Sequence, residues 1–321
     1  MSHARIDTHH HIVPPAWAAA LRARSYFGGQ PTPSWSAQLA LDVMDQLDIA
    51  TAIASVGRPG VFLGDTAEAV ALARAVNEFA AELARDHPGR FGFFASLPLP
   101  DIDASLREIE YAFDELTANG VIMLSHVAGT YLGDPAWDPV MAELARREAV
   151  IFVHPTAPGG PPVPGVPPFV ADFLLDTTRA AVNLVRHGVT ARYPSLRVIL
   201  AHAGGFIPYA AARVASLAES ADGRHLAREE FLDALRGFWF DTALSASPYT
   251  LPALLSFARP DRVLFGSDWP YARGDNHRYF TEQLDQYPLD AAARTAIDSA
   301  NAAALLGLPV PSPSPSPRQA R

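Results

Sequence analysis

The chain has 321 residues, of which 49% are hydrophobic and 18% charged, so it can bury a large core. Its net charge of −9 at pH 7 argues against a nucleic acid or an anionic membrane as partner. Cysteine and lysine are absent and all 25 basic residues are arginine, which excludes disulfides, thiolate metal sites and lysine chemistry. No leader and no long uncharged apolar segment is recognised, so we expect a soluble, cytoplasmic protein.

Short apolar runs rich in valine, isoleucine and phenylalanine alternate with segments of helical periodicity. This alternation is typical of βα units around a parallel sheet. Eight such runs predict an α/β fold of the closed (β/α)8 TIM-barrel type, forming one domain over residues 1–308. The runs are residues 4–11, 51–57, 91–97, 120–125, 150–154, 197–202, 237–241 and 262–268.

The segments between the runs predict helices that pack against the barrel. A stripe within residues 72–83, with Asp65 or Thr66 as cap and residues 87–89 as stop, indicates one helix, and a stripe within residues 106–116 indicates another. Further helices are expected at residues 36–47, 137–147, 177–192, 208–219, 227–235, 250–257 and 290–306.

Two segments rich in proline lie outside this alternation. Residues 158–168 follow the fifth run and are long enough to shape the mouth of a pocket. The Pro- and Ser-rich tail, residues 309–321, is expected to be disordered: solvated, mostly extended and without a part in the chemistry.

Polar residues that close apolar runs are the candidate site residues, because a barrel brings the C-terminal ends of its strands to one rim. Side chains alternate along a strand, so in the first run His10 should face away from its two neighbours. A histidine alone at a strand end is often a packed core residue, but four strands that deliver metal-type side chains to one rim favour a site. The residues concerned are His9 and His11 in the first run and His154, His202 and Asp268 in three later runs.

The motifs around these residues are 7–11 (Asp-Thr-His-His-His), 154–155 (His-Pro), 201–205 (Ala-His-Ala-Gly-Gly) and 266–270 (Gly-Ser-Asp-Trp-Pro). Together they resemble the metal-dependent decarboxylase branch of the amidohydrolase superfamily, which includes the aminocarboxymuconate-semialdehyde, resorcylate and methylsalicylate decarboxylases. The similarity spans roughly residues 6–307. Residues 91–98 and 240–252 are most similar to the 6-methylsalicylate decarboxylase group.

The resemblance implies that His9, His11, His154 and Asp268 hold a metal ion and that His202 stands beside it as an acid or base. It also implies decarboxylation of an aromatic ortho-hydroxy acid, such as 6-methylsalicylate, with proton delivery by Asp268 or by a water that His202 assists. Binuclear hydrolases of the superfamily use a carboxylated lysine as bridge, so a chain without lysine should hold one ion. We expect Zn²⁺, with Mn²⁺ as the alternative.

Candidates for substrate binding are Arg58, Arg213, Ser245, Tyr249 and Trp269. Arg213 either matches a position from which related decarboxylases send an arginine across a subunit interface or is an arginine on the surface of a helix. Family habit implies a homodimer or larger assembly. Arg58 follows the second run and either meets a carboxylate or shapes a loop. The other three follow the last two runs, where small and aromatic residues suit a flat ring. A segment that carries a substrate arginine in aminocarboxymuconate-semialdehyde decarboxylase is shortened around residues 25–33, which argues against that substrate.

Two other functions remain open at this point. The same barrel and ion would open a lactone or an amide if they activated water, with His202 or Asp268 as base. A non-catalytic scaffold is the third hypothesis, although a scaffold has no need of an open metal position.

Overall fold

The computed structural model describes residues 4–26, 32–157, 163–217, 219–223, 226–272 and 274–311. The shortened segment at residues 25–33 and the loop at residues 158–168 therefore fall only partly within the described residues. Most of the expected tail, residues 312–321, lies outside them.

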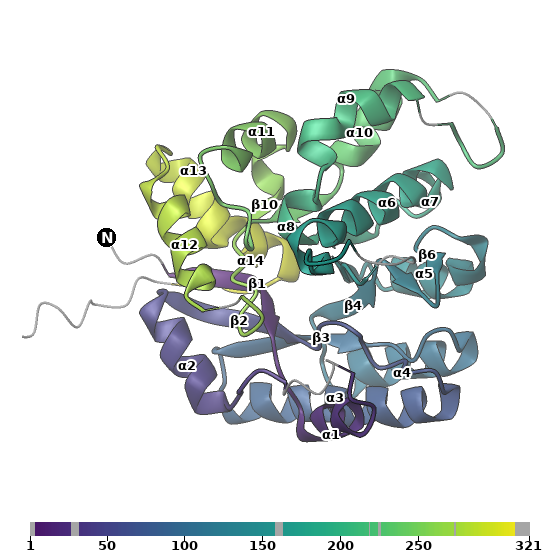
Figure 1. Cartoon of the computed structure of the whole chain (residues 1–321), viewed down its shortest axis with the longest axis vertical. Coiled ribbons are helices and arrows are strands. Elements are labelled where there is room, and N and C mark those ends of the chain that lie inside the picture. The colour runs from purple at the N-terminus through teal and green to yellow at the C-terminus, as the bar shows by residue number, and fades with distance from the viewer. Residues whose placement is uncertain are drawn as a thin grey trace, which may run out of the picture.

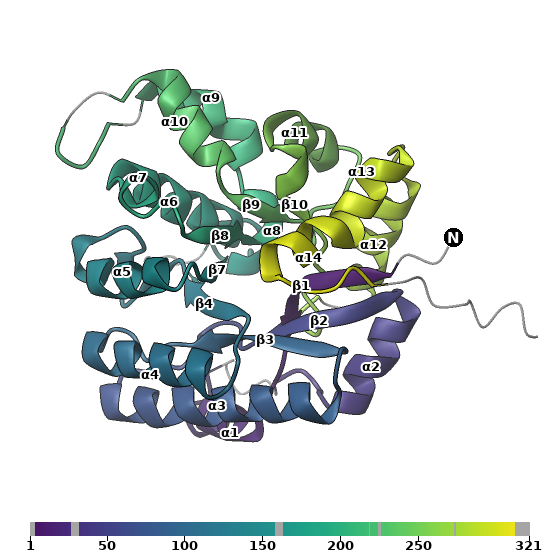
Figure 2. The ribbon, with the colours of Figure 1, turned by 180° about the vertical axis from the view of Figure 1, so that it is seen from behind.

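Parallel strands form a nearly closed barrel with helices around it, which confirms the predicted (β/α)8 architecture (Figures 1 and 2). Each strand pairs with the next one in the order of the chain. The strands are β1 (Arg5–His11), β2 (Ile49–Ser55), β3 (Phe91–Ser96), β4 (Gly120–Leu124), β7 (Val150–His154), β8 (Arg197–Leu200), β9 (Trp239–Asp241) and β10 (Val263–Leu264).

The seam between β10 and β1 is closed by backbone hydrogen bonds from the segment after β10. The Thr8 amide donates to the Phe265 carbonyl at 3.0 Å, and the Asp268 amide donates to the His9 carbonyl at 2.8 Å. These bonds carry the chain past the end of β10 alongside the histidines of β1. Asp268, which is distant in sequence, is thereby placed next to His9.

The barrel interior below the strand ends is filled by apolar side chains that point inward from successive strands. Ile6, Ile53, Phe94, Ile122 and Phe152 belong to one buried cluster, on which the C-terminal helix α14 (Asn301–Leu306) also packs. The Phe152 ring lies 4.8 Å from the His9 ring, centroid to centroid, so the histidines rest on a packed floor.

Most helices agree with the predicted ranges to within a few residues. The side chain of Asp65 caps α3 as expected, and that of Ser36 caps α2. Each accepts a hydrogen bond from a backbone amide of the first turn. These helices are α2 (Ala37–Gln46), α3 (Thr66–Asp86), α4 (Ile102–Asp114), α5 (Asp138–Arg146), α9 (Ile207–Leu217), α10 (Arg228–Arg236) and α11 (Thr250–Phe257).

Two predicted helices are divided. The one expected at residues 177–192 is α6 (Asp172–Arg186) and α7 (Val189–Arg192), because Gly188 between them adopts a φ of +66°. The one at residues 290–306 is α13 (Ala291–Thr295), a π-helical turn (Ala296–Ala300) and α14.

Several short elements were not predicted. They are α1 (Pro15–Ala23), α8 (Ala201–Gly204), α12 (Asn276–Gln286), the hairpin of β5 (His126–Val127) and β6 (Thr130–Tyr131), and 3-10 turns at Pro135–Trp137, Pro168–Val170 and Pro260–Arg262. None of the helices in the described ranges combines the length and apolar character needed to cross a bilayer.

Candidate metal centre

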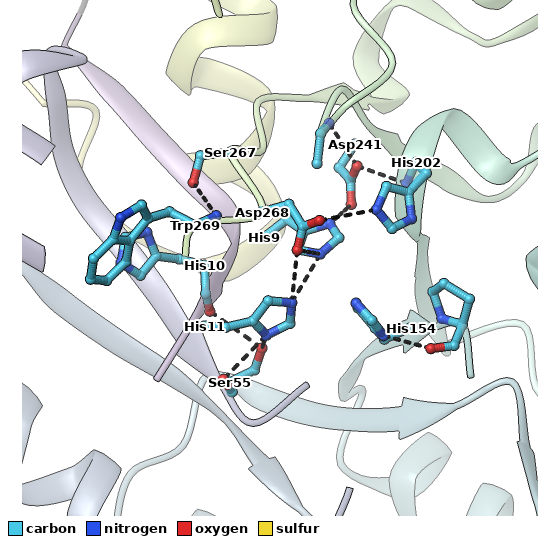
Figure 3. A network of polar contacts seen from close by, with 12 residues as sticks. His9, His10, His11, Ser55, His154, His202, Asp241, Ser267, Asp268 and Trp269 are labelled. Atoms are coloured by element: carbon cyan, nitrogen blue, oxygen red, sulfur yellow. Dashed lines mark hydrogen bonds and ion pairs between the residues drawn. The ribbon is translucent and has the colours of Figure 1, made fainter. Parts of the chain in front are cut away.

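His9, His11, His154 and Asp268 converge on one point at the C-terminal end of the barrel (Figure 3). Their four ligand atoms all lie within 4.8 Å of one another, and the side chains are buried. His9 Nε2 is 3.1 Å from His11 Nε2 and 3.2 Å from Asp268 Oδ1. His11 Nε2 is 3.3 Å from the same oxygen. The structure therefore brings together the four residues expected to hold a metal ion.

Each of the three histidines uses its Nδ1 for a hydrogen bond to an acceptor. Because carbonyl and carboxylate oxygens accept, the proton of each neutral ring is assigned to Nδ1, and the lone pair of Nε2 faces the centre. Such partners fix the ring orientation of metal-binding histidines. The acceptors of His9, His11 and His154 are, in that order, Asp241 Oδ2 at 2.8 Å, the Ser55 carbonyl at 3.3 Å and the Pro155 carbonyl at 2.8 Å.

The arrangement fits a divalent cation. The Nε2 atoms of His9 and His11 face each other at 3.1 Å, and the buried Asp268 Oδ1 makes no well-formed hydrogen bond within the described part of the chain. Buried lone pairs without a donor cost free energy, and a cation among them removes that cost. Three imidazole nitrogens and one carboxylate oxygen are a donor set for Zn²⁺ or Mn²⁺.

The pKa values show an excess of negative charge around the centre. Burial disfavours a charged His9, but the carboxylates of Asp241 and Asp268 outweigh it and raise its pKa to about 10. Burial would raise the pKa of Asp268, yet the neighbouring histidines, His9 above all, hold it well below its usual range. Burial lowers the pKa values of His11 and His154, which keeps both as neutral ligands. In the absence of a cation, a proton on His9 balances part of the charge.

His202 stands beside the second oxygen of Asp268, with 3.5 Å between His202 Nε2 and Asp268 Oδ2. Both residues adopt left-handed backbone conformations, with φ of +55° at His202 and +58° at Asp268. Such values are uncommon for residues other than glycine and persist only where the surroundings enforce them. At His202 the conformation is held by Asp241 Oδ1, which accepts hydrogen bonds from the amides of His202 at 2.9 Å and Ala243 at 3.0 Å.

Asp241 was missed as a functional residue. One of its oxygens orients the His9 ring and the other holds the His202 backbone, and the side chain is fully buried. The strand-end criterion that selected His154 could have found it, because Asp241 closes β9. His10 faces away from the centre, as expected: its Nδ1 lies 3.0 Å from Asp7 Oδ2, and its ring packs against Trp269 (Figure 3).

A cavity of about 780 Å³ opens above His154, His202 and Asp268. Its volume is in the range of small-molecule sites. Its walls are largely apolar; Phe169, Phe173, Leu244, Trp269 and Tyr271 contribute to them. Arg58 also lines it.

Several residues of the cavity wall have buried polar atoms that find no hydrogen-bond partner among the described residues, and Arg58 Nε and Tyr271 OH are two of these atoms. The Arg58 guanidinium lies over the Phe173 ring, 5.2 Å from its centroid, and donates to Tyr26 OH at 3.3 Å. Burial and the nearby Asp268 carboxylate raise the pKa of Tyr271, so its phenol is a hydrogen-bond donor.

The five residues expected to bind the substrate lie in different places relative to the cavity. Arg58 and Trp269 line the cavity. Ser245 is buried outside the lining, whereas Tyr249 is 89% exposed. Arg213 is exposed on α9, away from the cavity of its own chain. Tyr271, Phe173 and Leu244 are lining residues that the sequence did not single out; only Tyr271 had a signal, its position three residues after Asp268.

Comparison with known proteins places this geometry in a family. The amidohydrolase family profile matches residues 6–308, so the chain belongs to the amidohydrolase family. A 6-methylsalicylic acid decarboxylase of Penicillium expansum is 41% identical over 304 residues, which cover 92% of this chain and 94% of that protein.

Solved structures agree with this placement. A crystal structure of an amidohydrolase II superimposes with a TM-score of 0.88 at 33% identity, covering 95% of this chain and 100% of the other. A 2,6-dihydroxybenzoate decarboxylase complexed with 2,6-dihydroxybenzoate superimposes with a TM-score of 0.81 at 25% identity, covering 95% and 99%. The predicted membership in the decarboxylase branch is confirmed by these relatives.

Proposed function

We propose that the protein is a metal-dependent carboxy-lyase that removes CO₂ from an aromatic ortho-hydroxy carboxylic acid, 6-methylsalicylate or a close analogue. One observation carries the proposal: three histidines and Asp268 converge at the floor of an apolar cavity, with His202 beside them. The chain is 41% identical to a 6-methylsalicylic acid decarboxylase, which supports this class of reaction and substrate.

His9, His11, His154 and Asp268 would hold a single divalent ion, which we propose to be Zn²⁺, with Mn²⁺ as the alternative. The ion supplies positive charge that orients an anionic substrate and stabilises charge on its oxygens. The absence of lysine supports a single ion, since no carboxylated lysine is present to bridge two.

Decarboxylation needs one proton at the ring carbon that carries the carboxylate. The bond from this carbon to the carboxylate carbon breaks, its electron pair stays on the ring, and a C–H bond replaces it as CO₂ leaves. A hydroxyl group ortho to the carboxylate donates electron density to this carbon and makes it basic. Asp268 Oδ2 and His202 Nε2, 3.5 Å apart at the cavity floor, are the pair that we propose to hold and transfer the proton.

Arg58 and Tyr271 are proposed to bind the substrate from the cavity wall. The buried Arg58 Nε and Tyr271 OH are donors that an acceptor of the ligand would satisfy. A salicylate offers carboxylate and phenolic oxygens for this purpose. Phe173, Leu244 and Trp269 provide apolar contacts for the ring.

A homodimer is proposed from the surface around α9. Phe206, Tyr209 and Leu217 expose apolar side chains there, and Tyr249 lies just before α11, which packs against α9. Aromatic side chains such as these are enriched at the centres of protein interfaces. Arg213 lies one helical turn after Tyr209, so a second copy seated on this face would bring the partner an arginine. The cytoplasmic location stays a prediction.

The test is to incubate protein loaded with Zn²⁺ or Mn²⁺ with 6-methylsalicylate and related salicylates and to measure CO₂ and the phenol. The proposal expects CO₂ and 3-methylphenol in equal amounts, with loss of turnover in Asp268→Asn. No product from any salicylate, together with lactone opening that incorporates oxygen-18 from water, would refute it in favour of a hydrolase.

A further inference from the structure

His154 is oriented through the peptide group that follows it. Its Nδ1 donates to the Pro155 carbonyl at 2.8 Å. This carbonyl and the amide N–H of Thr156 belong to one planar peptide unit, so fixing one end fixes the other. The Thr156 amide donates to Asp176 Oδ2 at 3.0 Å. A carboxylate therefore stands behind the peptide group that holds the His154 ring.

Asp176, on α6, is fully buried and accepts hydrogen bonds from three separate segments of the chain. The donors are the Thr156 amide, Ser125 Oγ just after β4, and Tyr131 OH on β6, the last at 2.6 Å. All three groups donate, which is what an ionised carboxylate requires of its partners. Burial, and the hydrogen bond to Asp176, raise the pKa of Tyr131, so its phenol keeps the proton that it donates.

We propose that Asp176 is a positioning residue for the metal centre and acts on His154 through the peptide unit between Pro155 and Thr156. Negative charge at the amide end polarises the unit and makes the Pro155 carbonyl a stronger acceptor. A stronger acceptor keeps the His154 proton on Nδ1 and leaves Nε2 free to bind an ion. Asp241 does the same for His9 directly, with no peptide between.

The position of Asp176 agrees with an indirect role. Among the described residues, it is not one of those that line the cavity, so it does not contact a substrate there. The Ser125 amide donates to the His154 carbonyl at 2.9 Å, so Ser125, whose side chain bonds to Asp176, also fixes the His154 backbone. The inference rests on the proposed metal site but not on the proposed substrate.

The test compares Asp176→Asn with Tyr131→Phe in the full-length protein. Zn²⁺ affinity is measured by competition with a chelator, and the free energy of unfolding is measured on the metal-free forms. Asp176→Asn is expected to weaken Zn²⁺ binding about 10-fold, the lower end of the effect seen when a partner of a metal-binding residue is lost. At saturating Zn²⁺ its kcat and KM should return to wild-type values, because the side chain does not touch the substrate.

Tyr131→Phe is the matched control. It removes a donor to the other oxygen of Asp176 and leaves the contact with Thr156 in place. Its Zn²⁺ affinity should stay at the wild-type value even if its stability falls. Wild-type Zn²⁺ affinity in Asp176→Asn would overturn the inference. Equal losses of affinity in both variants, in proportion to their losses of stability, would also overturn it.

If Asp176→Asn does not fold, Thr156→Pro tests the same link, because it removes the amide hydrogen and keeps Asp176 with its other two donors. It should weaken Zn²⁺ binding, and unchanged affinity would overturn the inference. A wild-type protein that binds neither Zn²⁺ nor Mn²⁺ would overturn the proposed function together with this inference. Wild-type affinity in the variants overturns the inference alone.

Discussion

Replacing Asp241 by asparagine is expected to weaken metal binding strongly while the barrel stays folded. In the wild type, Asp241 Oδ2 accepts the Nδ1 proton of His9 at 2.8 Å, and Oδ1 accepts the amides of His202 and Ala243. The asparagine oxygen would continue to accept these two amides. Its NH₂ group would then face His9 Nδ1, and two donors would oppose each other. A change of tautomer removes this donor–donor repulsion by moving the His9 proton to Nε2, the atom that faces the metal centre.

The magnitude follows from this single contact. A hydrogen bond to a charged group contributes about 1.5–3 kcal/mol, and loss of a partner of a metal-binding residue lowers metal affinity about 10- to 100-fold. Because the tautomer itself changes, we expect the upper end of that range for Asp241→Asn. The assay is competition between the purified variant and a chelator for Zn²⁺ and, separately, for Mn²⁺. It is run at several pH values, because loss of the Asp241 charge also lowers the pKa of metal-free His9 and so reduces competition by protons. Decarboxylation at limiting metal should fall in parallel.

The matched control is Asp298→Asn, which alters a buried carboxylate at the opposite end of β1, where it accepts from Arg5 Nε at 3.1 Å. This control should lose stability and keep wild-type metal affinity. Wild-type affinity in Asp241→Asn, or an equal loss in both variants, would refute the reasoning about the His9 tautomer.

Three further predictions concern the pH, the cavity and the partner subunit. Metal-free His9 has a pKa of about 10, so at pH 7 its ring carries a second proton that an ion must displace. The affinity for Zn²⁺ should therefore rise about tenfold per pH unit between about pH 6 and 9. A dissociation constant independent of pH, measured by the same competition, would contradict this. Tyr271→Phe removes a buried hydroxyl that has no partner in the described residues. The free energy of unfolding of the ligand-free protein should therefore stay level or rise by about 1 kcal/mol, while KM for the salicylate increases. An unchanged KM would exclude Tyr271 from substrate binding. If the arginine of a second copy meets the substrate carboxylate, Arg213→Ala should raise KM about 10-fold or more without changing kcat. A wild-type KM in a variant that light scattering shows to be dimeric would exclude Arg213 from the site.

The strand ends show how far sequence periodicity reaches. The range of β7 was predicted to the residue, since a continuous apolar run ends in His154 and a proline. The runs that end in His202 and Asp268 were expected to be strands throughout, but β8 stops at Leu200 and β10 at Leu264. The chain then turns through left-handed conformations at His202 and Asp268. Neither residue is glycine, so the local sequence holds no sign of the turn.

Those turns are set by buried carboxylates that are distant in sequence. Asp241 accepts the His202 amide, and Asp7 accepts the amide and hydroxyl of Ser267, next to Asp268. Such pairings become visible only in the folded chain. The elements missed have other features in common with loops: α12 is largely polar and buries few side chains, and α1 is short and begins soon after the site histidines.

Cavity residues were harder to predict than metal-binding residues. Strand ends meet at one rim, so identity alone selected His9, His11, His154 and Asp268. A loop residue faces the cavity or the solvent according to the path of its loop, which sequence order does not reveal. Tyr249 and Tyr271 illustrate this: both follow late strands, yet the first is 89% exposed and the second lines the cavity.

The most direct test of the account is to strip the protein with a chelator and add back Zn²⁺ or Mn²⁺ in small steps while CO₂ release from 6-methylsalicylate is measured. The stripped protein should be inactive, and activity should rise in proportion to the added ion and level off at one ion per chain. Full activity in the stripped protein, or a plateau only at two ions per chain, would contradict a single ion held by three histidines and Asp268.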